Sequence, residues 1–205
     1  MLNEDYRDML QALSDEKVRF LLVGAYALAA HGYPRATMDI DIWIMPSPKN
    51  ADAVLRALRR FGAPLHNLTK EDLQKDGTIF QIGVAPRRID IITAASGLHF
   101  EDTYGRSLPV SIEGIEVHIP SIEDLIRLAL EEAGTSMENI VKVVIYFKNM
   151  KDYEAVKRTE FEYWQEHAPA LAEEPPASTV CQVVSLSKPD MLVEIDIVAL
   201  RGDIG

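Results

Sequence analysis

Met38-Asp39-Ile40-Asp41-Ile42-Trp43-Ile44, preceded by the turn Val23-Gly24-Ala25, is the stretch from which we predict the fold of this chain. Apolar and acidic residues alternate in it, which is typical of a half-buried β-strand. Because successive side chains of a strand point to opposite faces, Asp39 and Asp41 share one face. The other face is apolar, and we expect it in a core: Met38, Ile40, Ile42 and Ile44.

Two carboxylates at this spacing lie about 7 Å apart and repel each other unless a cation lies between them. Mg²⁺ takes oxygen ligands and keeps waters and substrate phosphates in its shell, so Asp39 and Asp41 suit this ion. The alternative is a solvated edge strand that carries two surface acids. The alternation alone fits both interpretations.

The segments on either side favour the metal site. Residues 17–23 are typical of a strand that leads into Gly24-Ala25 and then into a helix over residues 26–31. Small residues at such a turn let a phosphate approach the backbone N–H groups. Further along, Arg88-Ile89-Asp90-Ile91-Ile92 places a third acid inside an apolar run. A strand carrying Asp90 beside the first strand would complete a two-metal site.

In order and spacing, these motifs resemble those of the nucleotidyltransferase superfamily, which has the polymerase-beta-like fold. The family pattern is a G-[GS] turn, a helix, an hDhDh strand and a later hDh strand, where h is an apolar residue. Ala25 stands where that pattern has Gly or Ser. The chain looks closest to the small branch related to antitoxin and AbiEii-like nucleotidyltransferases, which suggests a toxin–antitoxin context. The resemblance covers residues 5–127.

The resemblance implies a mixed sheet with helices packed on it and a metal-dependent transfer reaction. Asp39, Asp41 and Asp90 would be the catalytic residues and would bind Mg²⁺ or Mn²⁺. Gly24 and Ala25 would hold the nucleotide phosphates. A nucleoside monophosphate would pass from a nucleoside triphosphate to an RNA, a protein or a small molecule.

Arg35 and Thr37 lie just before the acidic strand and are further candidates for nucleotide binding. Arg35 would pair with a triphosphate or with Asp39, and both remain open. Thr37 would orient Asp39 through its hydroxyl group. Trp43 shares the face of Asp41, where it would either contact a base or pack in the core, and we favour the core.

The rest of the first half predicts an α+β fold. An amphipathic helix over residues 3–14 carries Met9, Leu10 and Leu13 inward, and Asn50 would cap a second helix over residues 51–61. Hairpins are expected from residues 78–84 with 88–93 and from residues 108–111 with 115–119. Ser121 would cap the next helix, with Asp124 three residues on.

Composition bounds the class of protein. The chain has 205 residues, is 47% hydrophobic and has a net charge of −11, which argues against a general nucleic-acid binder with a basic face. Cys181 is the single cysteine, which fits a reducing cytosol, and we expect it to be a buried strand residue. Without a signal-like start or an apolar run of ~20 residues, we expect a soluble, cytoplasmic protein without membrane contact.

The second half resembles a different family, the reactive-intermediate deaminase (Rid, YjgF-like) proteins. The similar segments are residues 134–147, 149–156, 176–180 and 192–200, and the resemblance covers residues 128–200. It implies the β-α-β-β second half of a Rid (chorismate-mutase-like) fold. The segment itself predicts a strand (139–148), a helix (152–166), a Pro/Glu-rich loop (168–177) and two strands (179–186 and 191–200).

In deaminating Rid proteins an arginine after Pro-Ala holds a substrate carboxylate, but this chain has Ser178 there. A serine hydroxyl cannot replace the charged, bidentate guanidinium group of arginine, so Rid-type deamination is not expected. Glu194 alone is not a catalytic candidate. Rid proteins are trimers, so the resemblance implies a homo-oligomer. We therefore expect two domains, residues 1–127 and 128–205, joined by natural fusion or as a chimera. The alternative function is a non-catalytic assembly or ligand-binding module.

Overall fold

The computed structural model describes residues 2–33, 36–66, 68–186, 189 and 191–201, and its architecture is α+β with mixed sheets. Internal contacts divide the chain into two units, residues 1–128 and 129–205. Each unit has its own sheet, and the two are described separately below.

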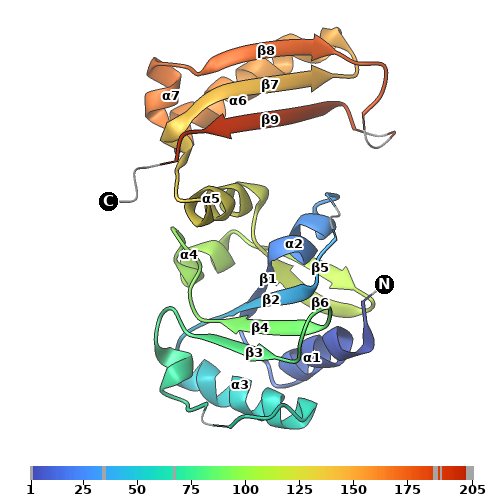
Figure 1. The fold of residues 1–205 in the computed structure, drawn as a ribbon, viewed down its shortest axis with the longest axis vertical. Helices are drawn as coiled ribbons and strands as arrows, with labels where there is room; N and C mark the ends of the chain where they lie inside the picture. Colours follow the sequence, from blue (N-terminus) through green and yellow to red (C-terminus); the bar gives the residue numbers. More distant parts are fainter. Residues whose placement is uncertain (1, 34–35, 67, 187–188, 190, 202–205) are drawn as a thin grey trace. The chain divides into compact units, whose positions relative to one another are not determined.

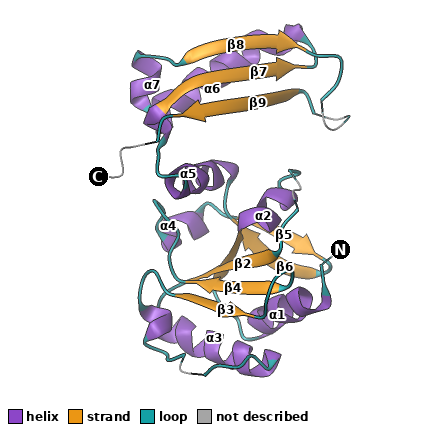
Figure 2. Ribbon diagram, viewed as in Figure 1, coloured by secondary structure: helices purple, strands orange, loops and turns teal. Residues whose placement is uncertain are grey.

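A four-stranded sheet forms the centre of the first unit, with helices packed against it and a separate hairpin (Figures 1 and 2). Its helices and strands are α1 (Glu4–Asp15), β1 (Phe20–Val23), α2 (Gly24–Ala30), β2 (Asp39–Ile44), α3 (Pro48–Phe61), η1 (Asp72–Gln74), β3 (Ile79–Ile82), β4 (Arg88–Ile92), α4 (Phe100–Gly105), β5 (Leu108–Ile112) and β6 (Ile115–Ile119). The boundary between the two units falls within α5 (Ile122–Glu132).

The central sheet has the strand order β1-β2-β4-β3. β2 pairs antiparallel with β1 and parallel with β4, and β3 pairs antiparallel with β4. A parallel pair needs a long crossover, which here contains α3 and β3. The two predicted hairpins are present, with β3 and β4 shorter than predicted.

α1 and α3 contribute the main core against one face of this sheet. Met9, Leu10 and Leu13 of α1 are fully buried, as predicted, and so are Val54 and Leu58 of α3. From β2, the predicted inward residues Ile40, Ile42 and Ile44 join the same core. Met38 does not, because β2 begins only at Asp39, and its side chain is 62% exposed. The predicted burial of Met38 was therefore wrong.

The start of α3 also differs from the prediction. The helix begins at Pro48, and its N-cap is Ser47, whose Oγ accepts a hydrogen bond from Asn50 N at 3.4 Å. Proline suits the first helical turn because its missing N–H would have no partner there. Asn50 is buried instead, and its amide group bonds Arg19 N at 2.8 Å and Met45 O at 2.9 Å. It therefore ties α3 to the start of β1 and the end of β2.

The second unit has a three-stranded sheet of order β8-β7-β9, in which β7 pairs parallel with β8 and antiparallel with β9 (Figure 1). Its elements are η2 (Met137–Asn139), β7 (Ile140–Phe147), η3 (Met150–Asp152), α6 (Tyr153–His167), α7 (Pro169–Glu173), β8 (Ala177–Gln182) and β9 (Val193–Ala199).

Two predictions for the second unit were wrong. The Pro/Glu-rich segment contains the short helix α7 rather than loop alone, because Pro169 opens a helical turn whose Leu171 is buried. Cys181 lies on β8, as a strand residue, but it is exposed rather than buried. Among the described residues, β8 pairs with β7 alone, and its side chains are mostly exposed to solvent.

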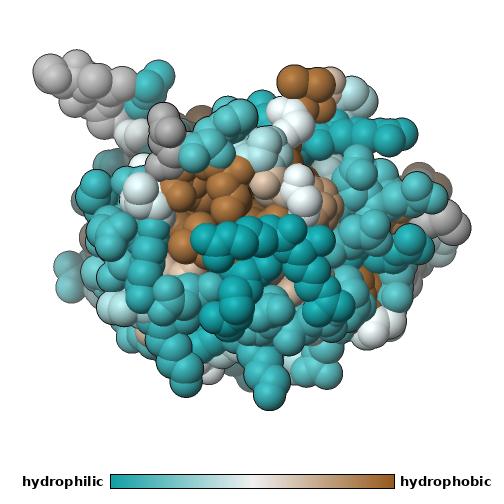
Figure 3. All heavy atoms as spheres, turned by 90° about the horizontal axis from the view of Figure 1, so that it is seen from below, coloured by the Kyte–Doolittle hydropathy of each residue, from teal (hydrophilic) through white to brown (hydrophobic). Residues whose placement is uncertain are grey.

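Polar side chains dominate the surface on the side seen in Figure 3, and hydrophobic side chains interrupt them in separate places. Within the described parts of the chain, no helix combines the length and apolar composition that crossing a bilayer requires.

Candidate metal centre

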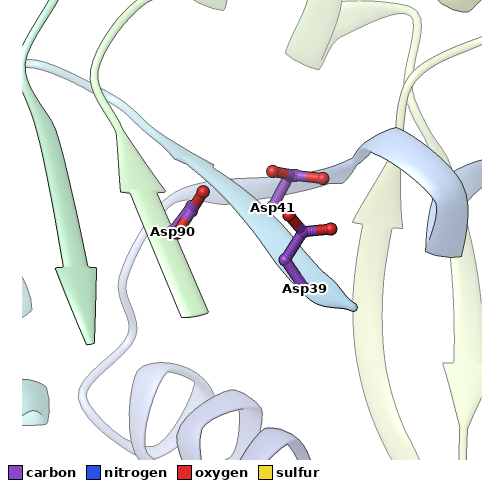
Figure 4. A group of neighbouring side chains, drawn as sticks. All are labelled: Asp39, Asp41 and Asp90. Carbon is purple, nitrogen blue, oxygen red and sulfur yellow. The ribbon is translucent and has the colours of Figure 1, made fainter. Parts of the chain in front are cut away.

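Three carboxylates meet on neighbouring strands of the first unit. In the parallel pair of β2 and β4, Asp41 lies opposite Asp90, and Asp39 lies opposite Arg88. Asp39, Asp41 and Asp90 each offer an oxygen atom, and these atoms lie within 4.8 Å of one another. Figure 4 shows Asp39 and Asp41 on β2 and Asp90 on the adjacent strand. The structure thus brings together the three acids named from the sequence.

The cluster lies on the sheet face away from the α1 and α3 core. Ile40 and Ile42 of β2 and Ile89 and Ile91 of β4 belong to that core, so the intervening acids point to the other face. Asp39 and Asp41 are half-buried, whereas Asp90 is only 6% exposed. Two of the three carboxylates are therefore partly accessible to solvent.

Thr37 contacts Asp39 as predicted. Its hydroxyl group donates a hydrogen bond to Asp39 Oδ1 at 2.6 Å, which fixes the orientation of that carboxylate. Arg35, the other candidate on this segment, lies outside the described residues. Nucleotide binding by Thr37 stays a prediction.

Gly24 lies directly against Asp41. A Cβ atom at position 24 would lie 2.1 Å from Asp41 Oδ2, and the backbone there is left-handed with φ +64°. Only glycine accepts both conditions without strain. α2 begins at Gly24 itself, and Ala25 is buried. Gly24 is therefore part of the wall of the carboxylate cluster.

Arg88 also belongs to the cluster, although we did not predict it as a site residue from the sequence. Its Nε donates to Asp90 Oδ1 at 2.8 Å and to Oδ2 at 3.1 Å, and its Nη2 donates to Asp39 Oδ2. The hydrogen bond that Arg88 donates to Asp90, and then the charges of Asp90 and Asp39, raise the pKa of Arg88 above its usual value. One signal was available in the sequence: Arg88 is two residues before Asp90 and so shares its face.

Tyr6 and Gln81 are two further polar residues near the carboxylate cluster. The Tyr6 hydroxyl donates to Met38 O at 3.4 Å or to Pro86 O at 3.3 Å, so it lies between the segments that lead into β2 and β4. Burial is the main cause that raises the pKa of Tyr6. Gln81 Nε2 donates to Asp90 Oδ2 at 3.3 Å.

Trp43 packs in a core, the interpretation we favoured. Its side chain is 1% exposed and meets the Phe100 ring edge to face, with ring centroids 5.3 Å apart. Among the described residues, its indole N–H is buried without a hydrogen-bond partner. Trp43 also lines an open cavity of about 400 Å³, together with Met45, Thr93, His99 and Phe100.

The donor set of the cluster fits a hard divalent cation. All three candidate ligands are carboxylate oxygens, which Mg²⁺ and Mn²⁺ prefer over nitrogen or sulfur. Gly24 leaves the space that the Asp41 carboxylate needs. Asp39, Asp41 and Asp90 are therefore the residues that would hold such an ion.

In the second unit, Ser178 and Glu194 do not form a site together. Ser178 pairs in register with Val143 and Glu194 with Tyr146, so they lie on opposite faces of the sheet. Glu194 instead lines an open cavity of about 350 Å³ with Tyr146 and Asp196. The hydrogen bond to Asp196 raises the pKa of Tyr146.

Comparison with known proteins finds similarity for the C-terminal part of the chain. Residues 114–201 match the sequence model of the family described as Endoribonuclease L-PSP. A RutC family protein of Synechocystis sp. is 37% identical over 86 residues, which are 42% of this chain and 61% of that protein. A RutC family protein of Pyrococcus abyssi is 33% identical over 76 residues, which are 37% of this chain and 54% of that protein.

Among solved structures, the YjgF gene product of E. coli is similar at 29% sequence identity with a TM-score of 0.34. That similarity covers 39% of this chain and 59% of the other chain. The chain thus spans little more than half the length of the proteins it matches. The family match begins at residue 114, earlier than the predicted residue 128, and it does not include the three carboxylates.

Proposed function

We propose that the chain, whose residues 114–201 form a Rid/YjgF/RutC (L-PSP) domain, also carries a metal-dependent nucleotidyltransferase site in its N-terminal unit. One observation carries this proposal: the oxygen atoms of Asp39, Asp41 and Asp90 lie within 4.8 Å of one another. The sequence resemblance over residues 5–127 supports it, with a mixed sheet of nucleotidyltransferase type as the scaffold.

In this proposal each carboxylate has a distinct part. Asp39 and Asp41 would hold the divalent cations, and Thr37 keeps Asp39 oriented. Asp90 completes the second cation site and helps to activate the acceptor hydroxyl group. Bound Mg²⁺ or Mn²⁺ supplies Lewis-acid stabilisation of the charge that develops on the transferred phosphoryl group. Gly24 lies beside Asp41, and in this proposal the Gly24-Ala25 turn would border the phosphates.

The reaction is the transfer of a nucleoside monophosphate. The acceptor hydroxyl oxygen bonds to the α-phosphorus as its proton leaves, and the bond from the α-phosphorus to the bridging oxygen breaks. Pyrophosphate is the leaving group. The acceptor is the hydroxyl of an RNA, a protein side chain or a small molecule.

A transfer assay tests this proposal. The intact chain is mixed with each labelled nucleoside triphosphate, Mg²⁺ or Mn²⁺ and total RNA, and transfer and pyrophosphate release are measured. We expect metal-dependent transfer, and we expect Asp41→Asn to reduce it at least ~100-fold, because one ligand charge is lost. Asp8→Asn on the exposed face of α1 is the matched control and should leave transfer unchanged. If the chain neither binds nor transfers nucleotide in the presence of metal, the proposal is wrong.

The second candidate function is a non-catalytic assembly or ligand-binding module, and the family match favours it because it concerns the C-terminal domain. Ser178 stands where a deaminase would need arginine, so we assign this domain no catalytic step. The partner would be a second copy of the chain. Light scattering tests this: association that grows with concentration is expected, and a strict monomer would contradict it.

A further inference from the structure

The guanidinium group of Arg88 is a cation already bound among the three carboxylates. Its Nε contacts both oxygens of Asp90, at 2.8 and 3.1 Å, and its Nη2 contacts Asp39. These are charge-assisted hydrogen bonds, which are shorter and stronger than neutral ones. Asp39 and Asp90 are also two of the oxygen donors that the proposed metal needs. Arg88 and a metal ion therefore require the same oxygen atoms.

The strand register fixes Arg88 in this place. Arg88 is the first residue of β4, lies opposite Asp39 of β2, and precedes Asp90 by two positions on the same face. The Tyr6 hydroxyl reaches the carbonyl groups of Met38 and Pro86, which lead into the two strands. Because the backbone is held on both sides, we expect the carboxylates to be freed by rotation of the partly exposed Arg88 side chain rather than by separation of the strands.

The cluster still attracts a cation when Arg88 is in place. Three carboxylates and one guanidinium leave a formal charge of −2, which draws a divalent cation to the same oxygen atoms. If the metal takes oxygen atoms of Asp39 and Asp90, the guanidinium loses its partners and needs another anion. Guanidinium forks bind phosphate oxygens well, and the side chain is 34% exposed, so it can turn outward.

We propose that Arg88 is an internal counter-ion of the carboxylate cluster, which weakens metal binding in the free protein and is released to the triphosphate when metal and nucleotide bind. This inference rests on the function proposed above. Arg88 acts here as a positioning residue that couples the two ligands: metal binds weakly until a nucleotide offers phosphates to the displaced guanidinium.

Titration of the intact chain with Mn²⁺ alone tests the inference, with isothermal calorimetry as the readout. We expect Arg88→Gln to bind Mn²⁺ about tenfold or more tightly than the wild type, because a competing charge-assisted contact is removed. Arg88→Lys keeps one charge but loses the fork, so its affinity should lie between the two. Arg87→Gln is the matched control, since Arg87 is an exposed neighbour whose nearest acid is Asp5, at 3.9 Å. It should bind Mn²⁺ like the wild type.

The Mn²⁺ affinities of these variants separate failure of the counter-ion inference from failure of the metal site. If Arg88→Gln and the wild type bind Mn²⁺ equally, or the variant binds more weakly, the counter-ion inference is wrong while the metal site stands. If none of the proteins binds Mn²⁺, both the inference and the metal-dependent function are wrong. If Arg88→Gln does not fold, because three carboxylates then repel without a cation, Arg88→Lys gives the comparison. It must bind Mn²⁺ more tightly than the wild type, or the inference fails.

Discussion

At the scale of single residues, Gly24 and Asp41 share one small space. Gly24 has φ +64°, and a Cβ atom there would lie 2.1 Å from Asp41 Oδ2. We predict that Gly24→Ala costs about 1–2 kcal/mol of stability, because an L-residue is strained in the left-handed region. We also predict weaker Mn²⁺ binding, because the Asp41 carboxylate must turn away. Urea unfolding and Mn²⁺ titration measure the two effects.

Gly62→Ala is the control for this prediction. Gly62 ends α3 with φ +83°, and nothing lies within 4 Å of a Cβ atom there. This variant should show a similar loss of stability with unchanged Mn²⁺ affinity. Equal Mn²⁺ affinity in the two alanine variants would contradict the role given to Gly24.

The acids of the cluster were predictable one by one, whereas their counter-ion was not. Alternation within a strand places Asp39 and Asp41 on one face without any knowledge of the fold. The contact between Arg88 and Asp39 joins residues 49 positions apart, and it depends on the parallel register of β2 and β4. Sequence periodicity carries no information about that register. Met38 was misjudged because alternation does not say where a strand begins.

At the scale of elements, an ion pair joins the start of β1 to α4. Arg19 donates to Glu101 through Nη1 at 2.9 Å and through Nη2 at 2.7 Å, and its guanidinium lies 4.6 Å from the centre of the Tyr104 ring. The hydrogen bond from Arg19 lowers the pKa of Glu101 below its usual value. Because the folded pKa is the lower one, the pair stabilises the protein above the unfolded pKa of about 4.3. The contribution is lost as pH falls through the folded pKa.

We therefore predict that Glu101→Gln lowers the thermal unfolding midpoint at about pH 7 and has little effect at about pH 2.5, where the wild-type carboxyl group is protonated. Glu116→Gln, which removes an exposed glutamate of β6, should change the midpoint at neither pH. Thermal unfolding followed by circular dichroism measures both variants. A decrease of the same size at both pH values would show that Glu101 acts through packing rather than charge.

Helices with a strong apolar period were predictable, but their first residues were not. α1 follows from Met9, Leu10 and Leu13, and its Asn3 cap accepts a hydrogen bond from Tyr6 N at 2.9 Å. α3 begins earlier than predicted because Ser47 and Pro48 form its first turn, while Asn50 bonds to other segments. Polar residues that suit a helix cap also suit tertiary contacts, and only the fold separates the two uses.

At the scale of the whole molecule, the family match covers most of the second unit and extends into the last residues of the first unit. The match starts at residue 114, whereas the internal contacts divide the chain after residue 128. The sheet of the second unit has β8 and β9 as its outer strands in the described residues. A sheet with unpaired outer strands favours pairing with another chain.

β9 presents the more apolar of these edges. Ile195, Ile197 and Val198 are between 44% and 51% exposed, which leaves branched apolar side chains in solvent. We predict that the intact chain self-associates through β9, and that Ile197→Lys weakens this association by about tenfold or more, because a charge on an edge strand opposes strand addition. Sedimentation velocity over a range of concentrations measures the association.

Gln165→Lys is the control for the added charge, because Gln165 is an exposed residue of α6 and is not part of β9. It should associate like the wild type, and circular dichroism should show that both variants fold. Mn²⁺ binding adds a second comparison: if the two units act independently, Ile197→Lys leaves it unchanged. Association that Ile197→Lys does not weaken would exclude β9 as the interface. If Ile197→Lys instead abolishes both association and Mn²⁺ binding, the metal site depends on assembly of the C-terminal domain.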